Sequence, residues 1–345
     1  MNLLAEVTIY TIAKELNMTS SMVSRAFNPN ARIAPEKRKM VLELAEKYGF
    51  SPNKHASRLS MKPINIGIIL SSRFDVNTQK MTEGIKKAHS RLKDYKINYD
   101  ISVIDKRKNT DKDYVDALEK YVNYDGIIVT GMSSPKCSEV LNCFYEKNKN
   151  IVQVQAVNEN TKCLFSSKHN EETASALAAE FLSNCLRFSK RKNVFLFTGD
   201  RESRLHSKAA NAFKKMCKSC GLNLVGCADM GDSEDKLSKF LPTFKSEYFD
   251  NVDGIYTTSG ICESLCKFLE CENDKPVFVS FDTHDVIKKY LENGIISATI
   301  AQNVSRQMEI AFENLAHYII DFVECPDIVY TDVQIVMKSN MHQFD

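Results

Sequence analysis

The stretch that decides the N-terminal fold is VTIYTIAKELNMTSSMVSRAFN, residues 7–28. Apolar residues recur at helical spacing twice within it, over residues 9–16 and again over residues 22–26. Thr8 and Thr19 stand just before these two repeats, where a hydroxyl can cap a helix. About three residues separate the two predicted helices, which is the spacing of a helix-turn-helix unit.

A third helix is predicted to begin at Pro35, because proline suits the first helical turn, where its missing N–H has no helical partner. Apolar residues continue at helical spacing to Tyr48, and Gly49 ends the helix. Residues 1–50 are therefore expected to form an all-α unit. Residues 51–62 form a short linker, which could make two helical turns but would be marginal alone.

Charge is unevenly distributed along the 345 residues. Residues 1–62 hold ten Lys or Arg and five Glu, a net of +5. The remainder holds 36 basic and 39 acidic residues, a net of −3. A basic head on a mildly acidic body indicates a polyanion partner for the head alone.

From residue 64 onward, short β-branched runs alternate with amphipathic helical stretches. The predicted strands cover residues 64–70, 99–104, 126–130, 151–154, 193–198, 222–227, 254–257, 277–281, 296–300 and 333–337. The predicted helices cover residues 79–93, 114–123, 170–185, 205–218, 259–270 and 304–323. This alternation indicates parallel sheets with helices on both faces. So many strands favour two α/β lobes with a cleft between them, and ligands of such sheets bind beyond the carboxyl ends of the strands.

Composition argues against the membrane and secreted classes of protein. The chain has no run of about 18 or more apolar residues. Its N-terminus also does not show the pattern of a signal peptide, in which a basic segment is followed by an apolar one and a cleavage site of small residues. Eleven cysteines at irregular spacing fit reduced thiols better than a disulfide framework. We therefore expect a cytoplasmic protein without membrane association.

Three motifs of the N-terminal part carry a resemblance to a known family. They are V-T-I-x-x-I-A at residues 7–13, MTSSMVSRAFN at residues 18–28, and YGFSPN at residues 48–53 with Ala56 and Leu59 beyond it. The chain thereby resembles the head of the lactose/galactose repressor (LacI/GalR) family of transcriptional regulators.

A second likeness covers the rest of the chain. The stretches VSFD at residues 279–282 and GIISATIAQ at residues 294–302 are similar to the sensor of that family, itself similar to periplasmic pentose- and hexose-binding proteins. The implied fold is an N-terminal all-α helix-turn-helix domain followed by a two-lobed α/β domain of the periplasmic-binding-protein type. The implied domains are a DNA-binding headpiece (1–50), a hinge (51–62), and an effector-binding and dimerisation domain (63–345). Within the last domain, lobe 1 is expected at about 63–158 and 285–317, and lobe 2 at about 159–284 and 318–345.

The resemblance places the second helix in the major groove, with its N-terminal residues against base edges. Ser20, Ser21 and Arg25 are then the side chains that can read sequence. Arg25 is the strongest candidate, because its guanidinium group can donate hydrogen bonds to guanine O6 and N7 together. The alternative is that Arg25 is only a solvated surface charge. Four short hydrogen-bonding residues are expected either to contact phosphates or simply to serve as caps and turns: Thr8, Thr19, Ser24 and Asn28.

The hinge is implied to become helical when two chains meet on DNA. Leu59 would wedge into a central base step of the minor groove and bend the duplex, with Asn53, Ala56 and Arg58 lining that groove. The alternative is a flexible linker in which Leu59 is incidental. A symmetric homodimer implies a pseudo-palindromic operator in double-stranded DNA.

The sensor is expected to bind a small polar effector, a sugar or sugar derivative, because carboxylates and amides at strand ends can pair with hydroxyl groups. Asp282 and Gln302 lead the candidates by resemblance. The other candidates are Ser71, Arg73, Phe74, Asn170 and Ser259. Ser207 stands where the family usually has an arginine, and the sequence leaves open which neighbour replaces it: Arg204, His206 or Lys208.

No enzyme or cofactor motif is present: the chain lacks a P-loop, a dinucleotide fingerprint, a nucleophile elbow and a zinc-protease motif. Cys217 and Cys220 form a C-x-x-C without a second such pair, so neither a metal nor a redox role is expected. We predict no catalysis, no cofactor and no metal. The predicted function is that of a sequence-specific transcriptional regulator, a repressor or else an activator, whose operator affinity an effector controls. The alternative is a sugar-binding protein of a transport or sensing system without DNA binding.

Overall fold

Long apolar runs in the sequence become the central strands of two sheets. The computed structural model describes residues 7–27, 33–50, 62–72, 75–105, 111–131, 134–147, 150–155, 157–158, 160–201, 203–321 and 323–344. β1 (Ile64–Ser72) is buried along nearly its whole length and lies between β2 (Ile97–Asp105) and β3 (Gly126–Thr130). A strand covered on both faces needs such a run, because helices lie on both sides of a parallel sheet.

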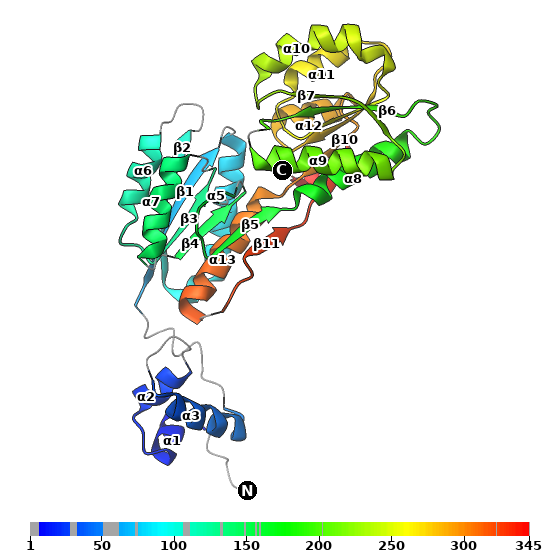
Figure 1. Cartoon of the computed structure of the whole chain (residues 1–345). Helices are drawn as coiled ribbons and strands as arrows, with labels where there is room; N and C mark the ends of the chain where they lie inside the picture. Colours follow the sequence, from blue (N-terminus) through cyan, green and yellow to red (C-terminus); the bar gives the residue numbers. More distant parts are fainter. Residues whose placement is uncertain are drawn as a thin grey trace.

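The first lobe contains a parallel sheet of order β11-β5-β4-β3-β1-β2. Its remaining strands are β4 (Asn150–Val154), β5 (Phe165–His169) and β11 (Ile328–Thr331). One face packs against α5 (Asp75–Arg91) and α13 (Val304–Asp321), and the other against α6 (Asp111–Lys120) and α7 (Pro135–Glu146) (Figure 1). A short 3-10 turn, η1 (Lys93–Tyr95), joins α5 to β2.

The second lobe repeats this plan with a sheet of order β12-β10-β9-β8-β6-β7, in which only β12 is antiparallel to its neighbour. Its strands are β6 (Asn193–Thr198), β7 (Asn223–Asp229), β8 (Gly254–Thr257), β9 (Val277–Phe281), β10 (Ala298–Ala301) and β12 (Gln334–Val336). One face is covered by α8 (Glu171–Cys185) and α9 (Arg204–Ser219). The other carries α10 (Glu234–Glu247), α11 (Glu263–Glu270) and α12 (Asp285–Glu292), with the turns η2 (Phe249–Asn251) and η3 (Met341–Phe344) beside them.

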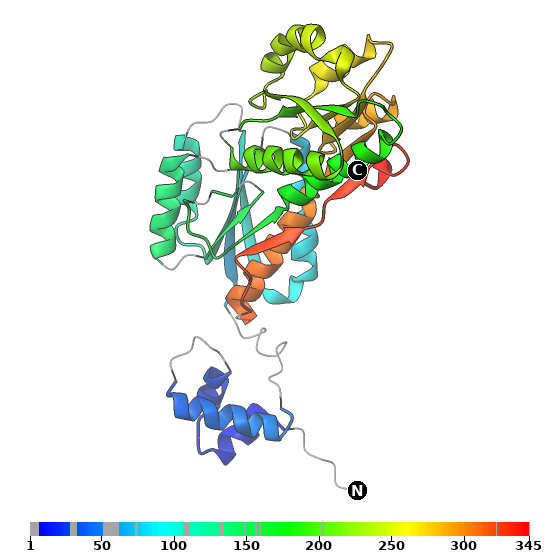
Figure 2. The same ribbon diagram turned by 45° about the vertical axis from the view of Figure 1, so that its right-hand side comes forward.

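The chain crosses between the lobes three times: from β5 to α8, from β10 to α13, and from β11 to β12. Figure 2 shows β11 running along the edge of the first lobe before the chain returns to the second. Because each crossing starts at the carboxyl end of a strand, the carboxyl ends of β5, β10 and β11 all lie where the lobes join.

Close packing of α5 against α13 holds the first lobe together on the crossing side. Gly84 allows this approach, since a Cβ at that position would lie 2.3 Å from the Ser305 carbonyl oxygen. Any larger residue would force the two helices apart. The start of α13, which carries the second crossing, is therefore held rigidly against α5.

The N-terminal part has three short helices at the predicted places: α1 (Ile9–Glu15), α2 (Ser20–Ala26) and α3 (Pro35–Lys47). Their buried core consists of Ile12, Ala13, Val23, Ala26, Val41 and Ala45. The Tyr48 hydroxyl donates to Glu15 Oε2 at 2.6 Å and so ties the end of α3 to α1.

All ten predicted strands are present, and the structure adds β5 and β11. The sequence of β5, FSSKH, is too polar to indicate a strand, whereas β11, IVYT, consists of strand-forming residues that the prediction passed over. Both pair with neighbouring strands of the first sheet. This pairing corrects the predicted lobe boundaries. β5 and β11 belong to the first lobe, whereas α12 and β10 belong to the second, because β10 bonds to β9.

Within the ranges described above, no helix combines the length and the apolar character needed to cross a bilayer.

Candidate functional site

Two of the predicted effector ligands lie together at the junction of the lobes. Asp282 directly follows β9 and Gln302 directly follows β10, and these strands are neighbours. The Gln302 side-chain Nε2 donates a hydrogen bond to Asp282 Oδ1 at 2.5 Å. Asp282 adopts a φ of +71°, a left-handed conformation that Asp and Asn tolerate better than most residues.

The Asp282 carboxylate lies in a desolvated place. Burial raises its pKa, because the charged form loses contact with water. The hydrogen bond from Gln302 opposes this rise, as do the nearby side chains of His284, His206 and Lys80. A ligand hydroxyl that donates to this carboxylate would therefore make a strong, weakly screened hydrogen bond.

A cavity of about 310 Å³ opens beside Asp282 and Gln302. It is walled by one face of α5, by the crossing from β10 into α13, and by the C-terminal turn η3. Its amide side chains are Asn77, Gln302, Asn303, Gln334 and Gln343. Its charged side chains balance, with Lys80, Lys87 and Arg306 against Glu83, Asp282 and Glu309. Amides and balanced charges suit a neutral ligand that carries several hydroxyl groups.

Lys80 connects the two lobes at this cavity, which sequence analysis did not anticipate. Its Nζ donates to the Phe344 carbonyl oxygen at 2.6 Å and to Thr283 Oγ1 at 3.3 Å. Lys80 belongs to α5 of the first lobe, whereas both partners belong to the second. A lysine on the polar face of a helix gives no sequence signal for such a contact.

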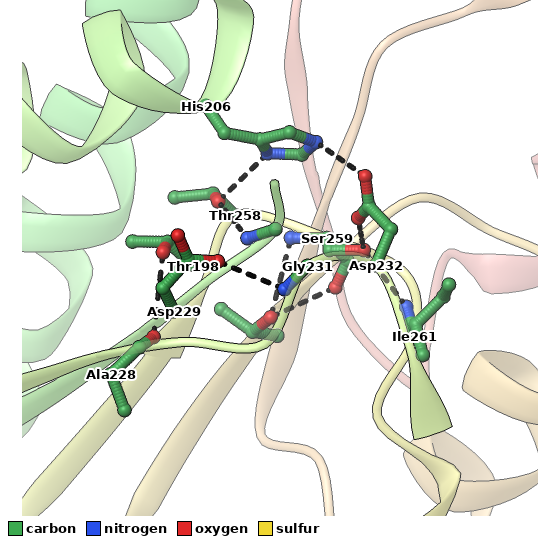
Figure 3. A network of polar contacts seen from close by, with 11 residues as sticks. Thr198, His206, Ala228, Asp229, Gly231, Asp232, Thr258, Ser259 and Ile261 are labelled. Carbon is green, nitrogen blue, oxygen red and sulfur yellow. Dashed lines mark hydrogen bonds and ion pairs between the residues drawn. The ribbon is translucent and has the colours of Figure 1, made fainter. Parts of the chain in front are cut away.

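A second group of polar side chains lies in the second lobe, around His206 (Figure 3). His206 Nε2 is 3.2 Å from Asp232 Oδ2, and its Nδ1 is 3.0 Å from Thr258 Oγ1. Gly199 makes room for this arrangement, since a Cβ there would lie 2.5 Å from both the imidazole and the Asp232 carboxylate. Of the three candidates that the sequence left open, His206 thus contacts Asp232 and Thr258 directly.

Asp232, which sequence analysis missed, is the charged centre of this network. Burial alone would raise its pKa, but hydrogen bonds from His206 and Ser259, with the charge of His206, hold that pKa well below the usual value. The Ser259 hydroxyl donates to Asp232 Oδ1 at 2.6 Å and accepts the Ile261 N–H at 3.2 Å. The hydroxyl of Ser259, which was predicted to bind the effector, is thus already hydrogen-bonded within the protein.

Two other predicted effector residues take structural roles away from the cavity. Asn170 caps α8, because its Oδ1 accepts the N–H groups of Glu172 at 2.9 Å and Thr173 at 3.0 Å. Ser71 is buried at the end of β1, where its N–H donates to Thr130 Oγ1 at 2.8 Å. Neither residue lines the cavity. Of the predicted effector residues that the structure describes, only Asp282 and Gln302 line it.

The N-terminal candidates lie on and beside α2. Thr8 Oγ1 and Thr19 Oγ1 accept the N–H groups of Thr11 and Met22, both at 3.3 Å, so both threonines cap helices as predicted. Ser21, Ser24 and Arg25 are exposed, whereas Ser20 is half-buried. Asn28, Asn53, Ala56, Arg58, Leu59, Arg73 and Phe74 lie outside the described residues.

No metal site is formed by the described part of the chain, where no three His, Cys, Asp or Glu side chains are grouped to hold an ion.

Comparison with known proteins identifies the α/β part. The family model for the periplasmic binding protein domain matches residues 66–321. The chain belongs to this family. Among solved structures, GanP, a glucose-galactose binding protein from Geobacillus stearothermophilus, is similar to it with a TM-score of 0.70. That likeness covers 81% of this chain and 99% of GanP at 17% sequence identity, and so it shows the shared fold.

The curated relatives of this chain are regulatory proteins. Catabolite control protein A of Priestia megaterium is 28% identical over 284 residues, which cover 80% of this chain and 74% of the relative. The HTH-type transcriptional regulator pepR1 of Lactobacillus delbrueckii subsp. lactis is 26% identical over 204 residues, which cover 58% of this chain and 57% of pepR1. The predicted combination is thereby confirmed: the chain has a sensor of the periplasmic-binding-protein type and is similar to regulatory proteins.

Proposed function

We propose that this chain is a homodimeric repressor that binds a pseudo-palindromic operator through its N-terminal helices and responds to a sugar-like effector held between its lobes. The observation that carries the proposal is that one chain joins a basic three-helix unit to a two-lobed sensor whose buried Asp282 faces a polar cavity. The regulatory relatives support the same combination.

DNA recognition is assigned to α2 as the second helix of a helix-turn-helix domain. Ser21, Ser24 and Arg25 are exposed on it, while Val23 and Ala26 face the small core. Arg25 can bind a guanine edge in two places, which discriminates bases by roughly 1 to 3 kcal/mol. Thr8 and Thr19 cap α1 and α2, and their position at helix N-termini also suits phosphate contacts.

Effector control is assigned to the junction of the lobes. A ligand that binds Asp282 and Gln302 contacts the second crossing directly, and through the cavity wall it also contacts α5 of the first lobe. Such a ligand binds one arrangement of the lobes more tightly than the other. The difference between these two binding free energies sets how far operator affinity can change. The regulation stays a binding event, and we expect the effector to be recovered unchanged.

Genomic footprinting of the full-length protein tests the DNA-binding part. We expect a small set of mirrored sites, and Arg25→Ala should lose discrimination between those sites and random duplex by about tenfold or more. Lys39→Ala is the matched control, since Lys39 is an exposed α3 cation paired with Glu43 and should keep discrimination. Equal discrimination by wild type and Arg25→Ala in gel shifts would contradict the assigned readout.

A thermal-shift screen with neutral monosaccharides and polyols then identifies the effector. The genes beside the footprinted sites narrow the choice of compounds. We expect one class to stabilise the protein and to change its affinity for the footprinted operator. Stabilisation without any effect on operator binding would instead favour the alternative of a sugar-binding protein.

A further inference from the structure

Two short segments of the second lobe hold nine Lys or Arg residues and no Asp or Glu. They are residues 186–192, between α8 and β6, and residues 204–223, which contain α9. The rest of residues 63–345 holds 27 basic and 39 acidic residues. Positive charge is therefore concentrated in one part of a body that is acidic elsewhere.

The two segments lie side by side in the fold. α8 and α9 cover the same face of the second sheet (Figure 1). The Ser183 hydroxyl, near the end of α8, donates to the carbonyl oxygen of Cys220, just after α9, at 2.8 Å. The Asn223 N–H donates to the Lys192 carbonyl oxygen at 2.9 Å and joins the start of β7 to the residue before β6. The C-terminal ends of the two helices therefore lie next to each other.

Five exposed cations make up the surface that we call the basic face: Arg187, Lys190, Lys214, Lys215 and Lys218. Lys218 follows Lys214 by four residues and Lys215 by three, so these side chains share one side of α9. Within the described residues none of the three is ion-paired, whereas Arg191 pairs with Asp253 at 3.1 Å. Like charges at this spacing repel each other, and a negatively charged partner would relieve that repulsion.

Nearby carboxylates neutralise only part of this charge. Glu180, exposed on α8, and Asp229, exposed at the end of β7, are close enough to act on the thiols of Cys220 and Cys227 respectively. Two carboxylates beside five cations leave the basic face positive.

An exposed aromatic ring belongs to the same surface. Phe188 is 91% exposed, the highest value among the described large apolar side chains. The guanidinium carbon of Arg187 lies 5.7 Å from the centre of its ring. Covering such a ring by a partner removes apolar surface from water and so favours association, and aromatic side chains are enriched among the residues that dominate protein interfaces.

The charge and the ring together favour a protein as the partner. The outside of a DNA duplex offers phosphates to the lysines, but it offers no apolar group to cover Phe188. A bilayer surface is bound by several apolar side chains at once. In these two segments, all of whose residues are described, Phe188 is the one exposed large apolar side chain. An acidic segment that also carries an apolar side chain satisfies both features.

We propose that the basic face binds an acidic segment of a partner protein, whose carboxylates pair with Lys214, Lys215 and Lys218 and whose apolar side chain covers Phe188. The proposal goes beyond operator and effector binding. No residue of the basic face lines the effector cavity or belongs to the N-terminal helices. The partner and the operator can therefore bind at the same time.

The first test measures binding of a short fluorescent peptide of Asp and Glu with a central leucine, by anisotropy, to the full-length protein at moderate ionic strength. Replacing Lys214, Lys215 and Lys218 together by Glu should weaken binding by about tenfold or more, because attraction becomes repulsion. The matched control replaces three exposed lysines of the first lobe by Glu: Lys93, Lys112 and Lys136. It changes the net charge equally and should bind within about twofold of wild type, since distant charges are screened.

The second test concerns the ring. Phe188→Ser should weaken binding of the leucine peptide by about threefold or more, because the leucine loses its apolar contact. The same peptide with serine in place of leucine should bind wild type and Phe188→Ser equally. Equal affinity of both proteins for the leucine peptide would remove Phe188 from the interface and overturn the proposal as stated.

Hydrogen exchange of the wild-type protein locates the bound peptide. We expect slower exchange in residues 186–192 and 214–223, and this measurement decides if the α9 variant does not fold. Protection confined to residues 1–62 would place the peptide on the basic head and overturn the proposal.

Two further outcomes would also overturn it. One is equal peptide affinity of the α9 variant and its control. The other is an α9 variant that keeps peptide binding but loses binding to a random DNA duplex or to phosphatidylserine vesicles, which would assign the basic face to nucleic acid or to lipid.

Discussion

Asp282 combines a buried carboxylate, a left-handed backbone and an amide partner, and each property constrains what can replace it. Asp282 is only 9% exposed, so a ligand that binds its carboxylate displaces little water. The φ of +71° strains most side chains but is accepted by Asn. Asn is thus the substitution that removes the charge and leaves the backbone in place.

For Asp282→Asn we expect a loss of effector affinity of about tenfold or more, because a charged acceptor is replaced by a neutral one. Operator affinity without effector should stay at the wild-type level, since α1, α2 and α3 are untouched. Calorimetry with the effector from the screen measures the first quantity, and gel shifts measure the second. Normal effector affinity in this variant would remove Asp282 from the proposed site.

His169 makes the stability of the protein depend on pH. Its pKa is lowered from an unfolded value near 6.5 to about 4 in the folded protein, so between these values the unfolded chain binds more protons. Stability is therefore fully present above pH 6.5 and falls as the pH is lowered toward 4, by about 3 kcal/mol in all. Glu171, Lys168 and His206 also act on this ring, and burial dominates them.

Urea unfolding of wild type and His169→Gln at pH 7 and at pH 4.5 isolates this contribution. The wild type should lose more stability on acidification than the variant, because the amide does not titrate. Equal losses in both proteins would show that His169 is not held neutral by burial.

At the scale of single elements, caps explain why some polar residues near the site are not ligands. α8 begins immediately after the first crossing, and Asn170 satisfies two of the N–H groups of its first turn. A polar residue after a strand can therefore belong to the following helix rather than to a pocket. Sequence position alone does not separate these two roles.

Asn170→Ala should destabilise the protein by about 1 kcal/mol, because two backbone donors lose their acceptor. Asn170→Asp keeps the acceptor oxygen and should be close to wild type. Hydrogen exchange of the first amides of α8 measures the local effect. Effector affinity should be unchanged in both variants, and a specific loss of affinity in Asn170→Ala would return this residue to the list of ligands.

At the scale of the whole molecule, side-chain bonds across the junction help to fix how the lobes sit. Lys80 makes two of them, to Thr283 and to the Phe344 carbonyl, beside the effector cavity. Hydrogen bonds from a charged donor contribute about 1.5 to 3 kcal/mol. That is enough to bias an equilibrium between lobe arrangements by about tenfold or more.

Lys80→Met should therefore favour a more open arrangement of the lobes. Small-angle X-ray scattering is expected to give a larger radius of gyration than wild type in the absence of effector. Lys80→Arg keeps a charged donor at the same place and is the control. A scattering curve for Lys80→Met that is identical to wild type would mean that these bonds do not determine the lobe arrangement.

Much of the architecture could be predicted from the sequence, because it depends on local patterns. The apolar runs that became β1, β3 and β9 and the amphipathic stretch of α13 each carry their own periodicity. The strand-end positions of Asp282 and Gln302 follow from those runs. The boundaries of the lobes did not follow, since they depend on the pairing of β11 with β5, which lies far from it in the sequence.

Local sequence determined the helices of the N-terminal unit, the alternation of strands and helices, and two of the effector candidates. Tertiary structure alone decided that His206 contacts Asp232 and that Lys80 ties the lobes together. The physical reason is the same in each case. Periodicity and capping are read over a few neighbouring residues. These contacts instead join side chains from separate elements, and those of Lys80 join opposite lobes, so their proximity exists only once the sheets have formed.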